Sequence, residues 1–461
     1  MGRGLPQTTK IMRKIIITIA LLAGLNVSAQ TYTVEQLVDS ALHNNVAVRN
    51  AQLSVEAAQQ QKKELFTKFF PTVSGTGLWF NTNRGMAEMK IDPQSMVPET
   101  LQQMMAQYAQ MLPPEIISAF GSLGNPISLS MMKNGTIASV MAVQPVFAGG
   151  QIVNGNKLAK VGAEASELQL RMSQNEVEKT TEQYFWQLAS LQEKMKTIAA
   201  VEELLNGINK DVTVAVQAGV AMRNDLLQVQ LRQNEVESQK VKLQNGISVL
   251  QMVLAQYCGL KTTDYQLRYD TSTTMTLAAR HDHQQALHNT AEYQLLNKQV
   301  EAARLQKRLE VGKNLPTVAV GAGYNYHNLM DRDHTFGMIF ATVAVPISSW
   351  WGGSYAIKRK SLELQKAQEQ LDDNSQLLKI RMQKAWNDVE EAFQQLSIAD
   401  RSIEQAEENL RLNRNYYQAG TCAMSDLLQA QLLYQQALDK RTDAFADYQN
   451  KVIEYRQAVG E

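Results

Sequence analysis

Residues 317–327 read TVAVGAGYNYH, and the alternation within this stretch decides the fold class. In an extended chain, Val, Ala and Tyr would share one face of this segment, and Thr, Ala, Gly and Asn would share the other. Such a segment is typical of a membrane β-strand, whose apolar face contacts lipid and whose aromatic end lies at the interface. An ordinary hairpin on a soluble helical protein is the alternative that this strand alone leaves open.

Three further strands are expected. Residues 335–345 would return alongside the first strand, and residues 72–81 and 136–146 would form a second pair. Each is close to the ~9–11 residues that cross a bilayer when tilted. Four strands are too few to close a barrel, for which about eight is the practical minimum, and open sheet edges cannot lie in lipid. Several chains are therefore expected to share one barrel.

An internal repeat organises the chain. The tetrapeptide VEAA at 55–58 recurs at 300–303, an offset of 245 residues. The tetrapeptide DLLQ at 225–228 recurs at 426–429, an offset of 201 residues. The difference, 245 − 201 = 44, is the number of extra residues in the first half, and we place them within an insertion at 84–135.

Long helices are expected in the proline-free parts of the chain. No proline occurs between Pro145 and Pro316 or after Pro346, and proline is the residue that breaks helix interiors. Apolar residues recur in these parts in steps of three and four, the spacing of a coiled-coil seam. Thr33 with Gln36 predicts a capping box at the start of the first helix. The expected helices span 33–68, 150–217, 225–257, 280–313, 353–418 and 426–458.

The composition and the first residues restrict the location and the class of function. The 45 Lys and Arg balance the 45 Asp and Glu, so nothing points to a nucleic-acid partner. Basic residues precede an apolar stretch at 15–25, and Val27-Ser28-Ala29 resembles a cleavage site. Residues 1–29 are therefore expected to be a signal peptide, with Met1 or Met12 as the true start. No apolar run long enough to span a bilayer follows, so no transmembrane helix is expected.

These features resemble the TolC-like outer-membrane efflux family. The opening YTVEQL at 32–37, the proline-led strand after each first helix, and the Gly pairs at 149–150 and 352–353 are similar to that family's pattern. The chain departs from the pattern at Asn45-Val46, where Asn-Pro is usual. The resemblance covers nearly all of residues 30–461. It implies a homotrimer in which twelve strands form one outer-membrane β-barrel and the helices form an α-barrel that extends into the periplasm.

The resemblance also implies a function and partners. The trimer would be a passive exit duct of a tripartite efflux or type I secretion system, gated at its periplasmic tip. It would dock with a periplasmic adaptor protein and an inner-membrane transporter, which would supply the energy. No P-loop or hydrolase motif is present in the sequence, so neither an enzyme activity nor a cofactor is expected. The alternative is a soluble periplasmic coiled-coil adaptor or scaffold, which would be expected to carry one helical hairpin rather than two.

The hairpin tips carry the candidate gate residues. By the resemblance, Asp426 lies where carboxylates ring the aperture, and Gln429 stands in the place of a second carboxylate. Asp225 lies where an Asp holds the tip closed, Tyr417 where a Tyr bonds to it, and Cys422 where an Arg partner is found. A ring of carboxylates near one axis would attract cations. Alternatively, both Asp residues only serve helix N-termini, and Tyr417 packs in the seam. The tip residues expected at the adaptor docking site are Gly219, Gly420, Leu226 and Leu427.

Two other features receive structural interpretations. The insertion at 84–135 holds eight of the 20 Met residues, and we expect a loop with a short amphipathic helix at 99–111 rather than a site for a soft metal ion. His281 and His283 have no further ligand cluster at a suitable spacing, so no metal site is expected there.

The expected architecture is mainly α with β, with long antiparallel helical hairpins and four transmembrane strands per chain. After the signal peptide, residues 30–260 would form a first structural repeat, made of a helix, a strand pair with the extracellular insertion, and a hairpin. Residues 261–461 would form a second repeat with the same order of elements.

Overall fold

The computed structural model describes residues 30–107, 118, 127–270, 275–329 and 332–461. The expected signal peptide at 1–29 and the end of the expected helix at 99–111 lie outside the described residues. The chain divides into two compact units, a helical unit and a sheet unit. The helical unit comprises Met1–Gln59, Val161–Ala302 and Gln365–Glu461, and the sheet unit comprises Gln60–Lys160 and Ala303–Leu364.

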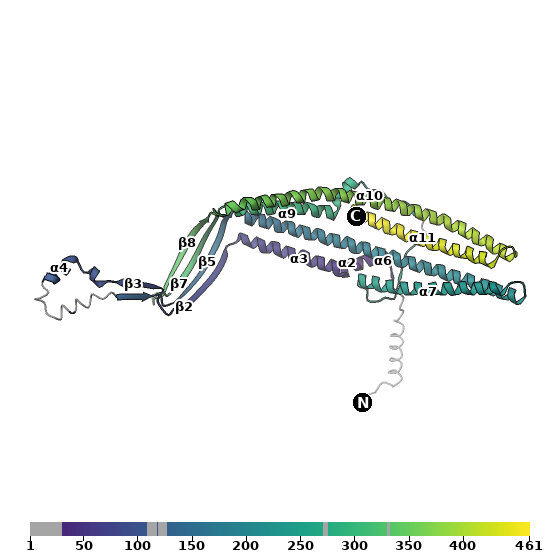
Figure 1. Ribbon diagram of the computed structural model, residues 1–461, viewed down its shortest axis with the longest axis horizontal. Helices are drawn as coiled ribbons and strands as arrows, with labels where there is room; N and C mark the ends of the chain where they lie inside the picture. The colour runs from purple at the N-terminus through teal and green to yellow at the C-terminus, as the bar shows by residue number, and fades with distance from the viewer. Residues whose placement is uncertain (1–29, 108–117, 119–126, 271–274, 330–331) are drawn as a thin grey trace, which may run out of the picture. The chain divides into compact units, whose positions relative to one another are not determined.

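Two antiparallel helical hairpins run through the helical unit (Figure 1). The first is formed by α6 (Gln151–Gln217) and α7 (Arg223–Cys258), and the second by α10 (Ser349–Gln418) and α11 (Met424–Val459). These bounds confirm the four long helices that the proline-free stretches predict. Each hairpin is held by apolar residues at helical spacing, such as Ile198, Leu205 and Val212 along α6, which are all buried.

The two shorter helical stretches are each interrupted, so the prediction of single helices at 33–68 and 280–313 is wrong. The first consists of α2 (Val34–Asn44) and α3 (Val46–Phe66), followed by the short 3-10 turn η1 (Thr67–Phe69). The second consists of α8 (His283–Asn289) and α9 (Ala291–Lys313). The predicted capping box at Thr33 and Gln36 is present at the start of α2.

Each interruption has a polar residue that serves both flanking helices. Asn45 is extended, with ψ of 133°, and its side-chain oxygen accepts a hydrogen bond from the Ala47 amide at 2.9 Å. Thr290 is extended too, with ψ of 137°, and its hydroxyl oxygen accepts from the Tyr293 amide at 3.3 Å. Asn and Thr are preferred at helix N-caps, because their side chains satisfy a free backbone amide. The two positions are 245 residues apart, the offset of the sequence repeat.

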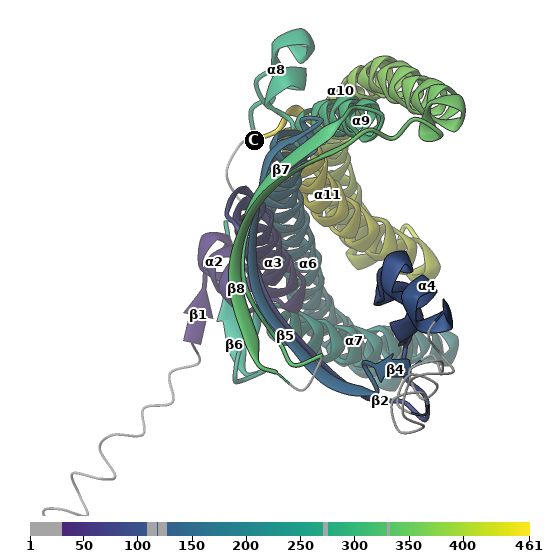
Figure 2. The ribbon, with the colours of Figure 1, turned by 90° about the vertical axis from the view of Figure 1, so that its left-hand side faces the viewer.

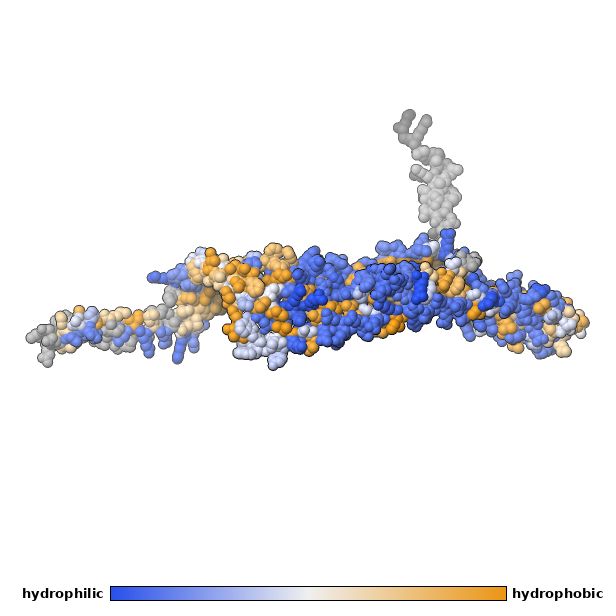
Figure 3. All heavy atoms as spheres, turned by 90° about the horizontal axis from the view of Figure 1, so that it is seen from above, coloured by the Kyte–Doolittle hydropathy of each residue, from blue (hydrophilic) through white to orange (hydrophobic). Residues whose placement is uncertain are grey.

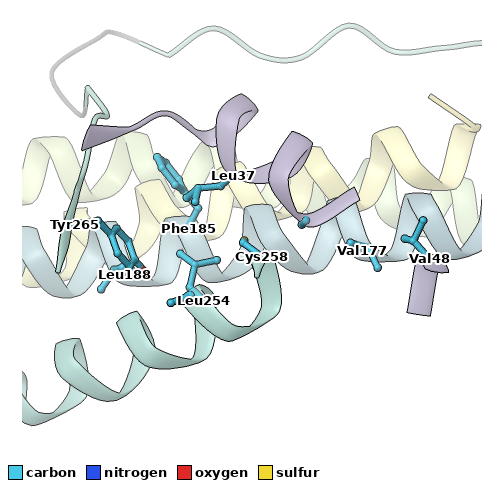
Figure 4. Packing of buried hydrophobic residues seen from close by; sticks show 10 residues of the cluster. Leu37, Val48, Val177, Phe185, Leu188, Leu254, Cys258 and Tyr265 are labelled. Carbon is cyan, nitrogen blue, oxygen red and sulfur yellow. The ribbon is translucent and has the colours of Figure 1, made fainter. Parts of the chain in front are cut away.

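The core near the first helices brings together elements distant in sequence (Figure 4). Leu37 of α2, Phe185 and Leu188 of α6, Leu254 of α7 and Tyr265 are all buried there. A short parallel pair of strands, β1 (Gln30–Tyr32) and β6 (Tyr265–Leu267), lies beside this cluster. These strands have three residues each, too few to leave an alternation that a sequence pattern can reveal.

The sheet unit is built on a four-stranded antiparallel sheet, which is strongly curved (Figure 2). Its strands are β2 (Thr72–Asn81), β5 (Asn134–Ala148), β7 (Thr317–His327) and β8 (His334–Ala344), in the spatial order β2-β5-β7-β8. All four predicted strands are present. The β5–β7 ladder joins the two halves of the sequence, and a bulge between Pro145 and Phe147 shifts its register.

Glycine allows the chain to leave β5 and enter α6 without a clash. Gly149 has a φ of +59°, in the left-handed region, and a Cβ atom there would lie 2.1 Å from the Gly312 carbonyl oxygen. Only glycine fits such an approach. This observation gives a structural reason for the first of the two Gly pairs.

The insertion at 84–135 contains strands that the sequence analysis did not predict. A second hairpin is formed by β3 (Ala87–Ile91) and β4 (Ile127–Met131). Between them lie the 3-10 turn η2 (Pro93–Met96) and α4 (Glu99–Gln107), which begins where the amphipathic helix was expected.

Candidate functional site

The two hairpin tips are built alike. Gly219 and Gly420 have φ of +73° and +70°, the left-handed conformation that ends a helix. The amide of Gly219 donates to Val216 and that of Val220 donates to Ala215. The same pair of bonds recurs 201 residues later, from Gly420 to Tyr417 and from Thr421 to Tyr416. Both turns are therefore Schellman motifs.

Each returning helix starts with a carboxylate that reaches back to the tip. An Asp225 carboxylate oxygen accepts a hydrogen bond from the Met222 amide at 3.1 Å, and an Asp426 oxygen accepts from the Ala423 amide at 3.2 Å. This is the acidic half of a capping box, because neither Met nor Ala has a side-chain acceptor to return the bond. The structure therefore gives both aspartates a helix-terminus role. Whether they also act at an aperture stays a prediction.

A groove of about 1000 Å³ lies between the two tips, inside the helical unit. One wall is apolar and comes from α6, where Leu204, Ile208 and Val212 line it. The candidate residues Asp225, Tyr417, Gly420, Cys422 and Leu427 also line it. Of the described residues, the other candidates, Asp426, Gln429, Gly219 and Leu226, are not part of this lining.

Tyr417 and Asp225 line the same groove, and the bond between them that the resemblance implies stays a prediction. Burial raises the pKa of the Tyr417 hydroxyl, and the nearby Asp225 carboxylate and Cys422 raise it further. Tyr417 also packs against the apolar cluster at the tip. This contact corresponds to the alternative role for Tyr417, packing in the seam between helices. Burial likewise raises the pKa of the Cys422 thiol, with a smaller contribution from Asp426, and its sulfur donates to the Asn413 carbonyl at 3.5 Å.

The leucines of the tips are not equally accessible. Leu427 is 3% exposed and packs in the apolar cluster with Val229 and Val236 of α7. Leu226 is partly buried against the same cluster, and Gln429 is exposed. A docking role for Leu427 would therefore be indirect, through the position it gives to the tip.

A buried arginine near the tips was not anticipated from the sequence. Arg232 of α7 is 8% exposed and donates to three side chains. Its Nε bonds to Gln431 at 3.1 Å and one terminal nitrogen to Gln435 at 2.7 Å, both on α11. The other terminal nitrogen bonds to Glu235 at 2.9 Å. The only signal in the sequence is the pair of glutamines at i and i+4 on α11, which does not identify a partner 199 residues away.

The sheet exposes an apolar face. In β7, Val320 and Tyr324 are exposed while Gly321 between them is buried. The register places Val140 of β5 beside Tyr324, and Ile339 of β8, which is 90% exposed, beside Ala322. The opposite face of β8 also carries large apolar side chains, since Phe336, Met338 and Phe340 lie on it. Hydrophobic residues also gather over the sheet in the space-filling view (Figure 3).

Exposed aromatic side chains lie at both ends of this sheet. Trp79 and Tyr324 are near one end, and Phe70, Trp351 and Tyr355 are at the other. From Phe70 to Trp79 the chain covers roughly 30 Å at the rise of a strand. With a tilt of about 40° this corresponds to about 23 Å of membrane thickness, close to the ~25 Å apolar band of outer-membrane barrels.

Residues 283–461 match the family model described as "Outer membrane efflux protein". The match spans 179 of the 461 residues, which is less than half of the chain. A comparison with curated proteins finds no significant match. The match covers the second hairpin and the strand pair β7–β8. The first half of the chain, where YTVEQL at 32–37 resembles the family, lies outside the matched residues.

Solved outer-membrane proteins and channels are similar in fold to most of this chain. The outer membrane protein VceC from Vibrio cholerae has 15% identity and a TM-score of 0.71, with 93% of this chain and 96% of that chain covered. The CmeC outer membrane channel of Campylobacter jejuni has 14% identity and a TM-score of 0.73, with coverage of 93% and 85%. The MtrE outer membrane channel of Neisseria gonorrhoeae, in its open state, has 14% identity and a TM-score of 0.70, with coverage of 93% and 88%. At such identities the likeness is one of fold.

These findings confirm the predicted family resemblance and the predicted class of helical hairpins with a strand pair in each half. At the level of the family, the predicted function as an outer-membrane efflux channel and the predicted outer-membrane location are also confirmed. The matched family and folds are those of channel proteins. Within the described ranges, no helix combines the length and the apolar character needed to cross a bilayer.

The histidines noted in the sequence are engaged in local contacts. His281 Nε2 lies 3.3 Å from a carboxylate oxygen of Glu461, and His283 Nε2 lies 3.3 Å from the Tyr455 hydroxyl. Within the described part of the chain, no three His, Cys, Asp or Glu side chains are grouped so as to hold a metal ion.

Proposed function

We propose that three copies of this chain form one outer-membrane channel, which serves as the passive exit duct of a tripartite efflux or secretion system. The observation that carries this proposal is the four-stranded sheet with two open edges and an exposed apolar face. Among the described residues, β2 and β8 each pair with one strand only. In lipid, their free amide and carbonyl groups need partners that water does not supply.

A ring of copies supplies those partners, because β8 of one chain can pair with β2 of the next. The two edge strands have 11 and 10 residues, so a pairing between copies would be nearly complete. Three chains would give twelve strands, above the practical minimum for a closed barrel of about eight. The choice of three over other ring sizes rests on the family resemblance.

The helical unit also has surfaces that fit neighbouring copies. On α7, Leu231 and Val241 are 63% and 61% exposed. On α10, Leu377 and Ile380 are 53% and 64% exposed. Apolar rows of this kind on two long helices are expected to be covered when hairpins stand side by side in a ring.

The partners are proposed from the family resemblance and from the exposed tips. Val220 and Met222 at the first tip are 80% and 74% exposed, and apolar residues at a turn suit contact with another protein. We infer that a periplasmic adaptor docks at the tips and that an inner-membrane transporter supplies the energy. Gate roles for Asp225, Asp426 and Tyr417 belong to this proposal, with Gln429 and Cys422 as neighbours in the same network.

The domain organisation is proposed as two structural repeats, at 30–260 and 261–461, after a signal peptide at 1–29. The matched Schellman turns and the matched helix interruptions support the repeats, because each pair recurs at the offset of the sequence repeat. The 44 extra residues of the first repeat would lie on the extracellular side, since they connect the strand ends opposite to the helices.

The test is a membrane fractionation followed by a mass measurement. The full chain is expressed in a Gram-negative host, inner and outer membranes are separated, and the protein is extracted in mild detergent. Light scattering corrected for detergent is expected to give three times the mass of one chain, in the outer-membrane fraction. A monomer or dimer outside the membranes would contradict the shared barrel and would favour the periplasmic scaffold.

A further inference from the structure

Arg232 is a buried charge that the proposed channel does not otherwise use. It lies nine residues after Arg223, the first residue of α7, and Gln431 lies seven residues after Met424, the first residue of α11. At ~1.5 Å per residue, the contact is roughly 10–14 Å from the hairpin tips. It joins the returning helices of two different hairpins, whereas nearby polar contacts such as Lys240 with Glu202 stay within one hairpin.

We propose that Arg232 clamps the two hairpins of one chain together and thereby limits how far the tip of the channel can widen. This inference rests on the proposed channel function. The clamp is the set Arg232, Gln431 and Gln435. Arg232 is a positioning residue in this account, because it acts on the aperture through the helices that it joins.

The geometry of the clamp resists separation of the helices. The guanidinium uses its Nε and one terminal nitrogen on two acceptors one helical turn apart on α11, so it is held at two points. Gln435 is held in turn by Gln239 of α7, to which its side-chain nitrogen donates at 2.9 Å. Pulling α11 away from α7 breaks three hydrogen bonds and leaves Arg232 only its ion pair with Glu235 on α7. The two guanidinium nitrogens that lose their acceptors are costly to leave unpaired unless water enters.

Apolar packing on both sides of the clamp adds to the contact between the two hairpins. Val229 and Val236 of α7, on either side of Arg232, are buried against Met424 and Leu427 at the start of α11. An outward movement of the second hairpin must separate this apolar contact together with the clamp. In a ring of hairpins, a wider aperture requires neighbouring hairpins to separate or rotate, so the strength of this contact sets the resting width.

The two acceptors on α11 are neutral amides, so the contact between the hairpins can be strengthened by a charged acceptor. Gln431 Oε1 accepts from Arg232, whereas the Gln431 side-chain nitrogen is buried and has no hydrogen-bond partner. Gln431→Glu therefore removes no hydrogen bond and places a carboxylate against the guanidinium. Charge-assisted bonds of this kind are roughly twice as strong as neutral ones. Arg232→Met has the opposite effect, since it keeps an apolar stem of similar length and removes every donor.

The experiment measures single-channel conductance of the full-length protein in planar bilayers, together with the melting temperature of the detergent-solubilised complex. Arg232→Met is expected to raise the mean conductance at least twofold, and Gln431→Glu is expected to lower it by a similar factor. Arg232→Lys, which can reach one acceptor at a time, is expected to lie between the wild type and Arg232→Met. Opposite shifts from two substitutions in one contact would not follow from general destabilisation.

Lys240→Met is the matched control. It removes a cation from the same helix, and its ion pair with Glu202 (2.6 Å) lies within one hairpin. Its conductance is expected to equal that of the wild type even if its melting temperature falls. The clamp is overturned if Arg232→Met and Gln431→Glu both conduct as the wild type does, or if Lys240→Met raises conductance as much as Arg232→Met. Failure of the channel function itself would appear differently, as a wild-type protein that forms no pores.

Discussion

The two aspartates at the hairpin tips have the same local geometry but different surroundings. Both carboxylates accept a hydrogen bond from the amide three residues before them. Asp225 is partly buried and lines the groove between the tips, whereas Asp426 is exposed and lies outside the lining. If Asp426 is the residue that faces the axis of the pore, its charge should attract permeating cations. The charge of Asp225 should instead interact with the Tyr417 hydroxyl.

Substitution by Asn separates these roles, because Asn keeps an acceptor for the amide and removes the charge. Asp426→Asn is expected to lower the ratio of cation to anion permeability of the pore, since three symmetry-related charges are lost. The loss of a negative charge at a helix N-terminus should also destabilise the protein by about 0.3–1 kcal/mol. Reversal potentials in a salt gradient and thermal unfolding are the measurements.

Asp225→Asn is the control for that experiment. It should cost a similar amount of stability, because the helix-terminus geometry is the same, and it should leave the permeability ratio unchanged. No change in selectivity for either variant would assign both aspartates to the helix ends alone, whereas equal changes for both would mean that Asp225 also acts on permeating ions.

At the scale of elements, the long helices and the four sheet strands follow from the sequence because their signals are long. Proline-free stretches of 60 or more residues leave few alternatives to helix, and alternation over ten residues fixes a strand and its faces. The strands β3 and β4 have five residues each and gave no such signal. The interruptions at Asn45 and Thr290 were missed because the apolar periodicity continues through them.

The interruption at Asn45 permits a substitution that would normally break a helix. Asn45 has φ and ψ of −64° and 133°, which suit a residue before proline, and Val46 is the first residue of α3 and is 62% exposed. Proline is favoured at that position. Val46→Pro is therefore expected to be neutral or to stabilise the protein by about 0.4–1 kcal/mol, through the entropy of the unfolded chain.

The matched comparison for this prediction is Leu53→Pro. Leu53 is 61% exposed and lies inside α3, so burial is the same and only the position in the helix differs. A proline there should cost about 3 kcal/mol or more. Thermal unfolding of the two variants is the measurement, and a loss of similar size in both would mean that α2 and α3 are one continuous helix in solution.

At the scale of the molecule, the sequence predicts elements better than it predicts their cross-connections. The repeat and the proline positions give two hairpins and two strand pairs. The β5–β7 ladder joins residues from 190 positions apart (Ile137 and His327) to 169 positions apart (Ala148 and Thr317), and Arg232 and Gln431 are 199 positions apart. No local sequence pattern identifies such distant contacts. The same limit holds for the assembly. The open edges of β2 and β8 require partner strands, but they do not determine how many copies of the chain form the ring.

Neighbouring residues of the edge strand β8 test the orientation of the sheet in the assembled protein. Ile339 lies on the exposed apolar face and is 90% exposed, and Met338 points to the opposite face. If that apolar face meets lipid, a lysine at 339 should cost about 2–4 kcal/mol at the middle of the bilayer. Ile339→Lys is therefore expected to reduce sharply the amount of assembled trimer in the outer membrane.

Met338→Lys is the control. It would place its charge in a water-filled lumen, so it should assemble normally and change the conductance. Both quantities are measured on outer-membrane fractions, by native gel electrophoresis and by bilayer recording. Equal assembly of the two variants would mean that neither face meets lipid, and the reverse order would mean that the sheet is turned inside out with respect to this account.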